Sequence, residues 1–436
     1  MSLVRVCCYW RAILLGHREV WSNIHLRGRD PNFLALQMAR AGNTPLDVTV
    51  HLHYYSRNLL PHNFQASVKT IWAQRQRVRS LTVYVAQHHH FKDSFDFEFP
   101  NLEELAWARR GPLSPAAPIG ALVWNADQFP KLRRLSVKRT PDWPMVSTTG
   151  LTRFKLEGPM TVAVADISNF LKHNRSLEYL EFVEFHIPAG IPGRVQPVKL
   201  YNLTTLSFSN VEHGHIFPYI SLPALKDLSI GPFDQPIWWS RTIWHDLSLP
   251  SGITSLNVKY HGWKGGLDRV CIMGFDDART RSLNLSEHSV GTRFEVMLSA
   301  LIHTPLHSVT SISFDEEGTN DPRYQLFSPP LQNVLLKLQN LRHMDLCWGH
   351  LTHQVLKQLG HACPELKALR VKTTRLSCPV TFGLALQMAK VRAIARMRLD
   401  KIECVVAEDG DDGAKTRELW DNLARDAKLE CYLGDE

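Results

Sequence analysis

The residues best suited to binding a metal ion are the histidine run His88, His89 and His90, with His51 and His53 earlier in the chain. Imidazole nitrogens bind transition metals well, but the ligands must converge on one point. Consecutive residues of a strand or loop point in different directions, and no cysteine or carboxylate lies nearby at ligand spacing. We therefore expect a polar loop here and no metal site.

A second group of possible ligands is the acidic segment 407–414, AEDGDDGA. It resembles part of a calcium loop, but it lacks the spaced ligands and the terminal glutamate of an EF-hand. A solvated acidic turn is the better interpretation. The eight cysteines form no C-x-x-C pair with metal or redox spacing, which favours reduced thiols and a cytoplasmic or nuclear location.

Motifs of catalysis are missing from the sequence. We find no G-x-S-x-G elbow, P-loop, H-E-x-x-H helix or G-x-G-x-x-G turn after a strand. We therefore expect a protein that is not an enzyme, with no catalytic residue and no cofactor.

Charge and hydropathy exclude two further classes of partner. The 50 basic and 42 acidic residues are spread along the chain, so the formal charge of +8 does not predict nucleic-acid binding. No apolar run is long enough to span a membrane, and the first residues contain no apolar signal core. The sequence predicts a soluble, unexported protein.

A protein partner is the remaining prediction, and an aromatic cluster is the first candidate for its contact surface. The segment PIWWSRTIWHDL contains Trp238, Trp239, Arg241 and Trp244. Tryptophan and arginine are enriched at the energetic centres of protein interfaces. The alternative is that these tryptophans pack over the helical or convex side of the fold.

The elements that would position such residues follow from a recurring motif, L-x-x-L-x-Φ, where Φ is apolar. It often follows a turn residue such as proline, as in PNLEELAW (100–107) and PKLRRLSV (130–137). The first apolar positions of the strong copies are Leu102, Leu132, Leu151, Leu177, Leu203, Leu225, Ile253, Val309, Leu341 and Leu366. Each copy predicts a short strand whose alternate residues face a common interior.

Because one such strand cannot bury its apolar side alone, the copies must stack with their strands parallel. Helical spacing between strands appears at Val164, Ile167, Phe170 and Leu171, with Asn174 as a stop signal. Two more helices are predicted from further apolar stripes, namely Leu331, Val334, Leu335 and Leu338, and Leu351, Val355, Leu356 and Leu359. The expected fold is an α/β leucine-rich-repeat solenoid, or horseshoe, with a doubly wound α/β domain as the alternative.

The amino-terminal segment lies outside this repeat. In VRVCCYWRAILLGHREVWS, the pattern V-C-x-x-W-R, then L, then V-W-S resembles the second half of an F-box of the large fungal F-box families. The matching residues are Val6, Cys7, Trp10, Arg11, Leu14, Trp21 and Ser22. The next segment, GRDPNFLALQMARAGNTPLDVTVHL, has the helix, turn and strand that follow the box in those proteins.

The resemblance predicts four parts. These are a partial F-box-like helical segment (1–26), a linking helix and first strand (27–74), the degenerate repeat array (75–405), and an acidic turn with a carboxyl-terminal cap (406–436). In the family, the box docks on the Skp-type adaptor of an SCF ubiquitin ligase, and the repeats hold the substrate. The resemblance thus implies an adaptor and a cullin as partners, with an unknown protein substrate.

The same resemblance assigns Val6, Cys7, Trp10, Arg11 and Trp21 to the box, where they support its fold or contact the adaptor. Amphipathic burial explains these residues equally well. The segment that opens the family's box has no counterpart before Val6, so we expect an incomplete box. Two functions remain: substrate recognition for an SCF-type ligase, and a repeat scaffold with no ubiquitin link.

Overall fold

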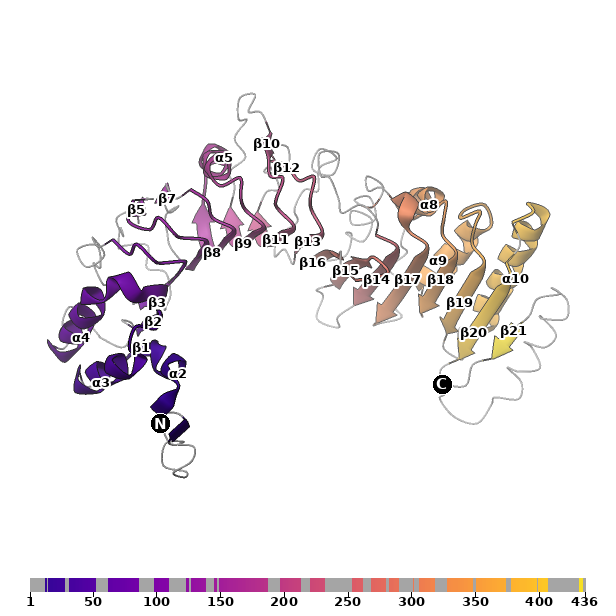
Figure 1. Ribbon diagram of the computed structural model, residues 1–436. Coiled ribbons are helices and arrows are strands. Elements are labelled where there is room, and N and C mark those ends of the chain that lie inside the picture. Colours follow the sequence, from indigo (N-terminus) through magenta and orange to yellow (C-terminus); the bar gives the residue numbers. More distant parts are fainter. Residues whose placement is uncertain are drawn as a thin grey trace. The chain divides into compact units, whose positions relative to one another are not determined.

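The protein has an α/β fold built on parallel strands, as the sequence predicts (Figure 1). The computed structural model describes residues 12–13, 15–27, 31–51, 62–85, 98–109, 123–124, 127–138, 145–146, 149–186, 197–212, 220–231, 253–261, 268–279, 282–289, 301, 306–317, 328–347, 350–373, 378–397, 399–406 and 431–433. The chain divides into two compact units, Met1–Leu203 and Thr204–Glu436.

Unit 1 contains a sheet in which consecutive strands are parallel neighbours. Its strands are β1 (Asn23–Leu26), β2 (Leu46–His51), β3 (Val78–Val85), β4 (Glu104–Arg109), β6 (Arg134–Lys138), β8 (Arg153–Thr161) and β9 (Tyr179–His186). Its helices are α2 (Arg18–Ser22), α3 (Pro31–Ala41), α4 (His62–Ala73) and α5 (Val164–His173), with the 3₁₀ turn η3 (Arg75–Arg77). The short strands are β5 (Val123–Trp124), which pairs with β7 (Met145–Val146), and β10 (Val198–Lys199).

Unit 2 continues the same design. Its strands are β11 (Thr205–Glu212), β12 (Ile220–Ser221), β13 (Asp227–Ile230), β14 (Ser255–His261), β15 (Asp268–Phe275), β16 (Ser282–Ser289), β17 (Ser311–Glu317), β18 (His343–Cys347), β19 (Ala368–Thr373), β20 (Lys401–Val406) and β21 (Cys431–Leu433). Its helices are α8 (Ser328–Lys337), α9 (His350–Leu359) and α10 (Cys378–Ile394), with the 3₁₀ turn η6 (Leu306–Ser308). Along this part of the chain α8 packs against α9, and α9 against α10.

One part of unit 2 departs from a simple series of repeats. Strand β13 is parallel to β16, and β14 is parallel to β17, while β15 runs antiparallel between β14 and β16. The order in space is therefore β13, β16, β15, β14, β17. Two antiparallel hairpins reverse the progress of the chain here, so β14, which follows the motif copy at Ile253, and β16 exchange places in the sheet.

The entrance to the strands repeats one hydrogen-bonded turn. The backbone N–H of Leu102 donates to the carbonyl oxygen of Phe99 over 3.1 Å. The same bond joins Leu132 to Phe129, Leu177 to Asn174, Leu203 to Leu200, Leu225 to Leu222, Val309 to Leu306, Leu341 to Leu338, and Leu366 to Cys363. The leucine of the motif is thus the last residue of a turn that directs the chain into the next strand.

Alternate strand residues are buried, which places the core on one side of each sheet. In β4, Leu105 and Trp107 are buried while Glu104 and Ala106 are partly exposed. In β8, Phe154 is fully buried and contacts Phe170 of α5 at 4.5 Å between ring centroids. Helix α5 contains the apolar stripe that the sequence predicts, and its C-cap is Asn174.

Proline and glycine account for the ends of α3 and the start of α8. Helix α3 begins at Pro31 and ends at Ala41, and Gly42 follows with a positive φ of 56°. A left-handed residue at this position ends the helix, and glycine adopts it without a Cβ clash. In α8, Pro329 and Pro330 occupy the first turn, where a missing N–H costs no hydrogen bond.

Asn174 ties the end of α5 to Leu151, in the turn before β8. Its side chain is fully buried, its Nδ2 donates to the carbonyl of Phe170, and its Oδ1 accepts from the N–H of Leu151. Cys363 occupies the equivalent position in the repeat that ends at β19, and its thiol donates to the carbonyl of Leu335. Burial raises the pKa of this free thiol to about 12, so it remains protonated and packs as a small apolar group.

The largest fully buried side chain is Arg392 of α10. Its guanidinium donates to the carbonyl oxygens of Leu359, Ala362, Cys363 and Leu366, at 2.6 to 3.4 Å. These carbonyls lie at the end of α9 and in the turn before β19, where the negative end of a helix dipole favours a cation. One side chain therefore holds α10, α9 and a repeat turn together.

We predict that Arg392→Leu lowers the free energy of unfolding by about 3 kcal/mol, because four buried carbonyls lose their donors. The matched control is Lys390→Leu, which removes the same charge from an exposed position of the same helix. Urea unfolding followed by circular dichroism measures both variants. Equal stability of the two variants would contradict this account of Arg392.

Candidate protein-interaction face

The side of each sheet that faces away from the core presents registered rows of polar side chains. In unit 1, the strand pairing places one row across β2 to β9, made of Asp47, Ser80, Glu104, Arg134, Arg153 and Tyr179. A second row, two residues further along each strand, is Thr49, Thr82, Ala106, Ser136, Lys155 and Glu181. We call this surface the outward face of unit 1.

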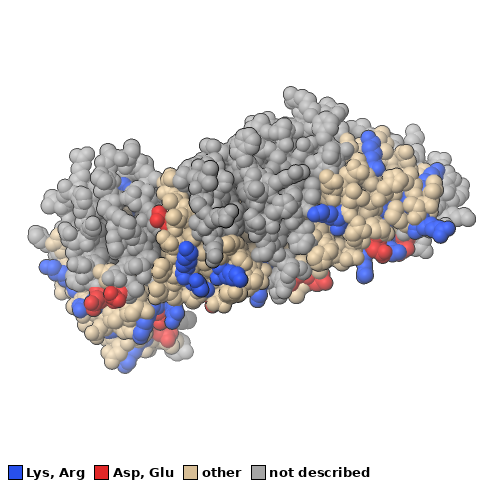
Figure 2. Space-filling model, turned by 90° about the horizontal axis from the view of Figure 1, so that it is seen from above, with Lys and Arg blue, Asp and Glu red and all other residues tan. Residues whose placement is uncertain are grey.

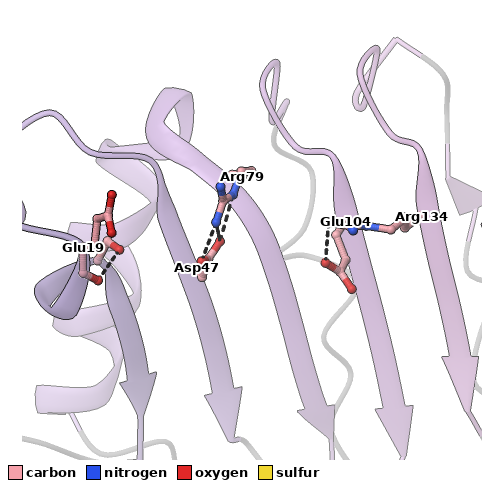
Figure 3. Close-up of polar contacts among 6 residues, drawn as sticks. Glu19, Asp47, Arg79, Glu104 and Arg134 are labelled. Atoms are coloured by element: carbon pink, nitrogen blue, oxygen red, sulfur yellow. Dashed lines mark hydrogen bonds and ion pairs between the residues drawn. The ribbon is translucent and has the colours of Figure 1, made fainter.

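Cross-strand ion pairs lie along the first row and join its residues to one another or to an adjacent residue. Arg79 donates through Nε and Nη2 to the carboxylate of Asp47, with Nη2 2.8 Å from Oδ2, and Arg134 Nη2 lies 3.0 Å from Glu104 Oε2 (Figure 3). The bond to Asp47 raises the pKa of the Arg79 guanidinium. Exposed pairs of this kind stabilise a fold by only about 0 to 1 kcal/mol. Their main effect is to fix the positions of charges on the face.

A denser network lies on β6, β8 and β9. Lys155 Nζ is 3.0 Å from Glu181 Oε1, the hydroxyl of Tyr179 donates to Glu181 Oε2 at 2.6 Å, and Lys138 pairs with Glu157. The guanidinium of Arg153 lies 4.6 Å from the centre of the Tyr179 ring. Burial, followed by the bond to Glu181, raises the pKa of Tyr179 to about 12, so this phenol stays a hydrogen-bond donor at neutral pH.

Aromatic rings mark the other end of the outward face. The ring of His51, a residue that is only 3% exposed, stacks on the half-buried Tyr84 with centroids 4.9 Å apart, and on His25 with centroids 6.4 Å apart. Between this stack and the charged network, the second row consists of the half-buried small residues Thr82, Ala106 and Ser136. Small residues leave room for a polypeptide on this strand face, and fixed charges beside them can orient it.

The equivalent face of unit 2 has a charged row on its last strands. Ser313, Asp345, Arg370 and Glu403 are aligned across β17 to β20. Arg370 Nε lies 3.6 Å from Glu403 Oε1, and Lys401 Nζ lies 3.2 Å from Glu403 Oε2. Partial burial raises the pKa of Asp345, and Arg370 opposes that shift only in part.

Charges of both signs are interspersed over the described surface. Figure 2 shows Lys and Arg side chains in separate groups, with Asp and Glu side chains between them. A broad field of one sign would favour nucleic acid, whereas local groups of both signs favour specific contacts with another protein.

The partner-binding residues predicted from sequence fall mainly outside the described residues. Val6, Cys7, Trp10 and Arg11 lie there, as do Trp238, Trp239, Arg241 and Trp244, the run His88 to His90, and the acidic segment 407–414. Their roles remain predictions.

Trp21 is the exception among these residues, because the structure describes it. It lies in α2, where its side chain is buried and the guanidinium of Arg40 in α3 sits 4.5 Å from its ring centre. Its place in the structure is thus that of a packing residue.

The described ranges contain neither a candidate metal site nor a candidate membrane helix. No three His, Cys, Asp or Glu side chains there are grouped as a metal site would require, and no helix there is long and apolar enough to cross a membrane.

Comparison with known proteins gives no family for the chain. No protein-family model matches the sequence, and no curated protein matches it either.

Sequence reasoning did not name the residues of the outward rows as candidate binding residues. Their signal is present in the motif itself, at the positions between the apolar residues, such as Glu104 and Arg134 beside Leu105 and Leu135. Which of these residues become neighbours depends on the register between strands, which a single motif copy does not contain.

We predict that Asp345→Asn stabilises the protein at neutral pH. A carboxyl group whose pKa is raised on folding weakens the fold once it ionises, so the gain appears as the pH rises through the unfolded value of 3.8. Unfolding free energies at several pH values measure the difference, with the exposed Asp400→Asn as control. An increase in unfolding free energy that is as large below pH 3.8 as at neutral pH would contradict the prediction.

Proposed function

We propose that this protein is a leucine-rich-repeat solenoid that binds another protein through the outward faces of its strands. The observation that carries the proposal is the outward face of unit 1, where registered rows combine half-buried small residues and positioned charges. The repeated turn supports the solenoid, because it sets the same strand entrance in successive copies of the motif.

Within this role, we propose that the protein recognises substrates for an SCF-type ubiquitin ligase. The support is the resemblance of residues 6–22 to the second half of an F-box, followed by the helix and strand expected after it. Helix α3 and strand β2 lie where this resemblance predicts a helix and a strand. The partners would be a Skp-type adaptor, a cullin and a protein substrate.

The second candidate function is a repeat scaffold with no ubiquitin link. Its support is the position of Trp21, whose side chain packs inside unit 1 beneath Arg40 and is only 5% exposed. A residue of the box-like set that serves packing leaves fewer side chains for an adaptor. Binding through the outward face is common to both candidates.

Affinity purification of the tagged chain from the cells that express it separates the two candidates. Recovery of a Skp-type adaptor and a cullin is the result expected for the ligase subunit. We further expect Trp10→Ala to lose the adaptor while keeping the substrate. Consistent absence of adaptor and cullin, with other proteins still recovered, would leave the scaffold.

A variant of the strand face tests the binding surface itself. Thr82→Arg places a long cation in the middle of the second row, and we expect at least a tenfold loss of recovered partner, corresponding to about 1.4 kcal/mol. The control Gln65→Arg makes a similar change on the exposed side of α4. Equal recovery with both variants, at unchanged circular dichroism, would place the partner elsewhere.

A further inference from the structure

Two cations at the strand entrances of unit 2 lack a carboxylate partner. Arg342 directly precedes β18, and Lys367 directly precedes β19. Both side chains are exposed, and in the part of the chain that the structure describes neither forms an ion pair.

These two residues are direct neighbours. The backbone N–H of Lys367 donates to the carbonyl of Arg342 over 3.0 Å, and the N–H of Ala368 donates to the same carbonyl over 2.9 Å. Paired strands lie about 4.8 Å apart, so the two charged side chains leave the sheet edge side by side. Like charges placed opposite each other weaken a sheet unless something compensates them.

The residues around the pair add hydrogen-bond donors. Arg342 and His343 both donate backbone N–H groups to the carbonyl of Thr310, so β17 lies alongside. The side chain of His343 is exposed and Ser311 is half-buried, whereas the hydroxyl of Thr310 already donates to the carbonyl of Thr254 over 3.3 Å. We call Thr310, Ser311, Arg342, His343 and Lys367 the basic edge.

The acidic residues of the neighbouring turns form no ion pair with the two cations within the described ranges. Asp400 follows Lys367 in the same row, since its N–H donates to the carbonyl of Lys367, and both Asp400 and Glu365 are exposed. Glu403 is already engaged by Arg370 and Lys401.

At the equivalent positions of unit 1 the charges alternate. The same N–H to carbonyl bonds link Arg79, Glu103 and Arg133 in order across β3, β4 and β6. Arg79 pairs with Asp47, and Arg133 donates to the carbonyl of Gly150. Two cations directly side by side are therefore a local feature of β18 and β19.

We propose that the basic edge binds an acidic polypeptide segment rich in aspartate and glutamate. The Arg342 guanidinium can hold one carboxylate through two parallel bonds, Lys367 can engage a second, and the hydroxyl of Ser311 can donate to either. Ser311 and His343 lie two residues before Ser313 and Asp345 on the same strands, so the basic edge adjoins the charged row of unit 2. The proposal does not depend on the ligase role.

The test is fluorescence anisotropy of the full chain with labelled peptides. One peptide alternates aspartate and glutamate with glycine and serine, and its neutral counterpart carries asparagine and glutamine instead. We expect the acidic peptide to bind, the neutral one to bind on the order of tenfold more weakly or not at all, and the affinity to fall with added salt. Equal binding of the two peptides, or no binding of the acidic one, would overturn the proposal.

Paired variants locate the site. Arg342→Gln with Lys367→Gln should weaken binding of the acidic peptide about tenfold or more, whereas Lys69→Gln with Lys172→Gln removes the same charge from exposed positions of α4 and α5 and should not. An equal loss in both double variants would show charge attraction without a site. The exchange Arg342→Lys with Lys367→Arg keeps the charge, so it should retain binding even if the glutamine variant folds poorly.

Two further probes identify the kind of anion. A single-stranded oligonucleotide of equal charge should bind more weakly than the acidic peptide, and tighter binding would overturn the proposal in favour of a nucleic-acid surface. A phosphoserine form of the neutral peptide should also bind more weakly than the carboxylate form, and tighter binding would make phosphate the ligand and overturn the stated carboxylate chemistry.

Discussion

The structure depends on the burial of one apolar side of each strand by its neighbours. A single turn and strand presents a few apolar side chains, which it cannot cover by itself. The parallel register of unit 1 solves this by aligning Leu81, Leu105, Leu135, Phe154 and Leu180 in one row, all of them 0 to 3% exposed. A slip of one residue would expose that row and bury the charged one, so the core fixes the register.

Once the core fixes the register, the outward side chains become available for binding. Their types are not dictated by packing, since pairs such as Arg134 and Glu104 contribute little to stability. The two units use this freedom differently. At the strand entrances of unit 1 the charges of Arg79, Glu103 and Arg133 alternate, whereas unit 2 places Arg342 and Lys367 side by side without an ion pair in the described structure and keeps Asp345 although its ionisation opposes folding. Groups kept at a cost to stability are candidates for binding.

The sequence predicts the regular features of the fold because they depend on local spacing. The motif identifies the strands, the helical stripe 164–171 identifies α5, and Pro31 and Gly42 mark the ends of α3. The exchange of β14 and β16 was not predictable, because both carry the same motif and only the antiparallel β15 decides their neighbours. The role of Arg392 was equally hidden, since the carbonyls it binds lie at least 26 residues away.

The central claim is that partners contact the outward face of unit 1, and photo-crosslinking tests it most directly. A photoreactive amino acid would replace Thr82 or Ser136 on that face, and Gln65 on α4 as the reference. After irradiation in cells, we expect a partner protein to be joined to the chain at the two strand positions and not at the helix position. Adducts confined to the helix position would contradict the claim.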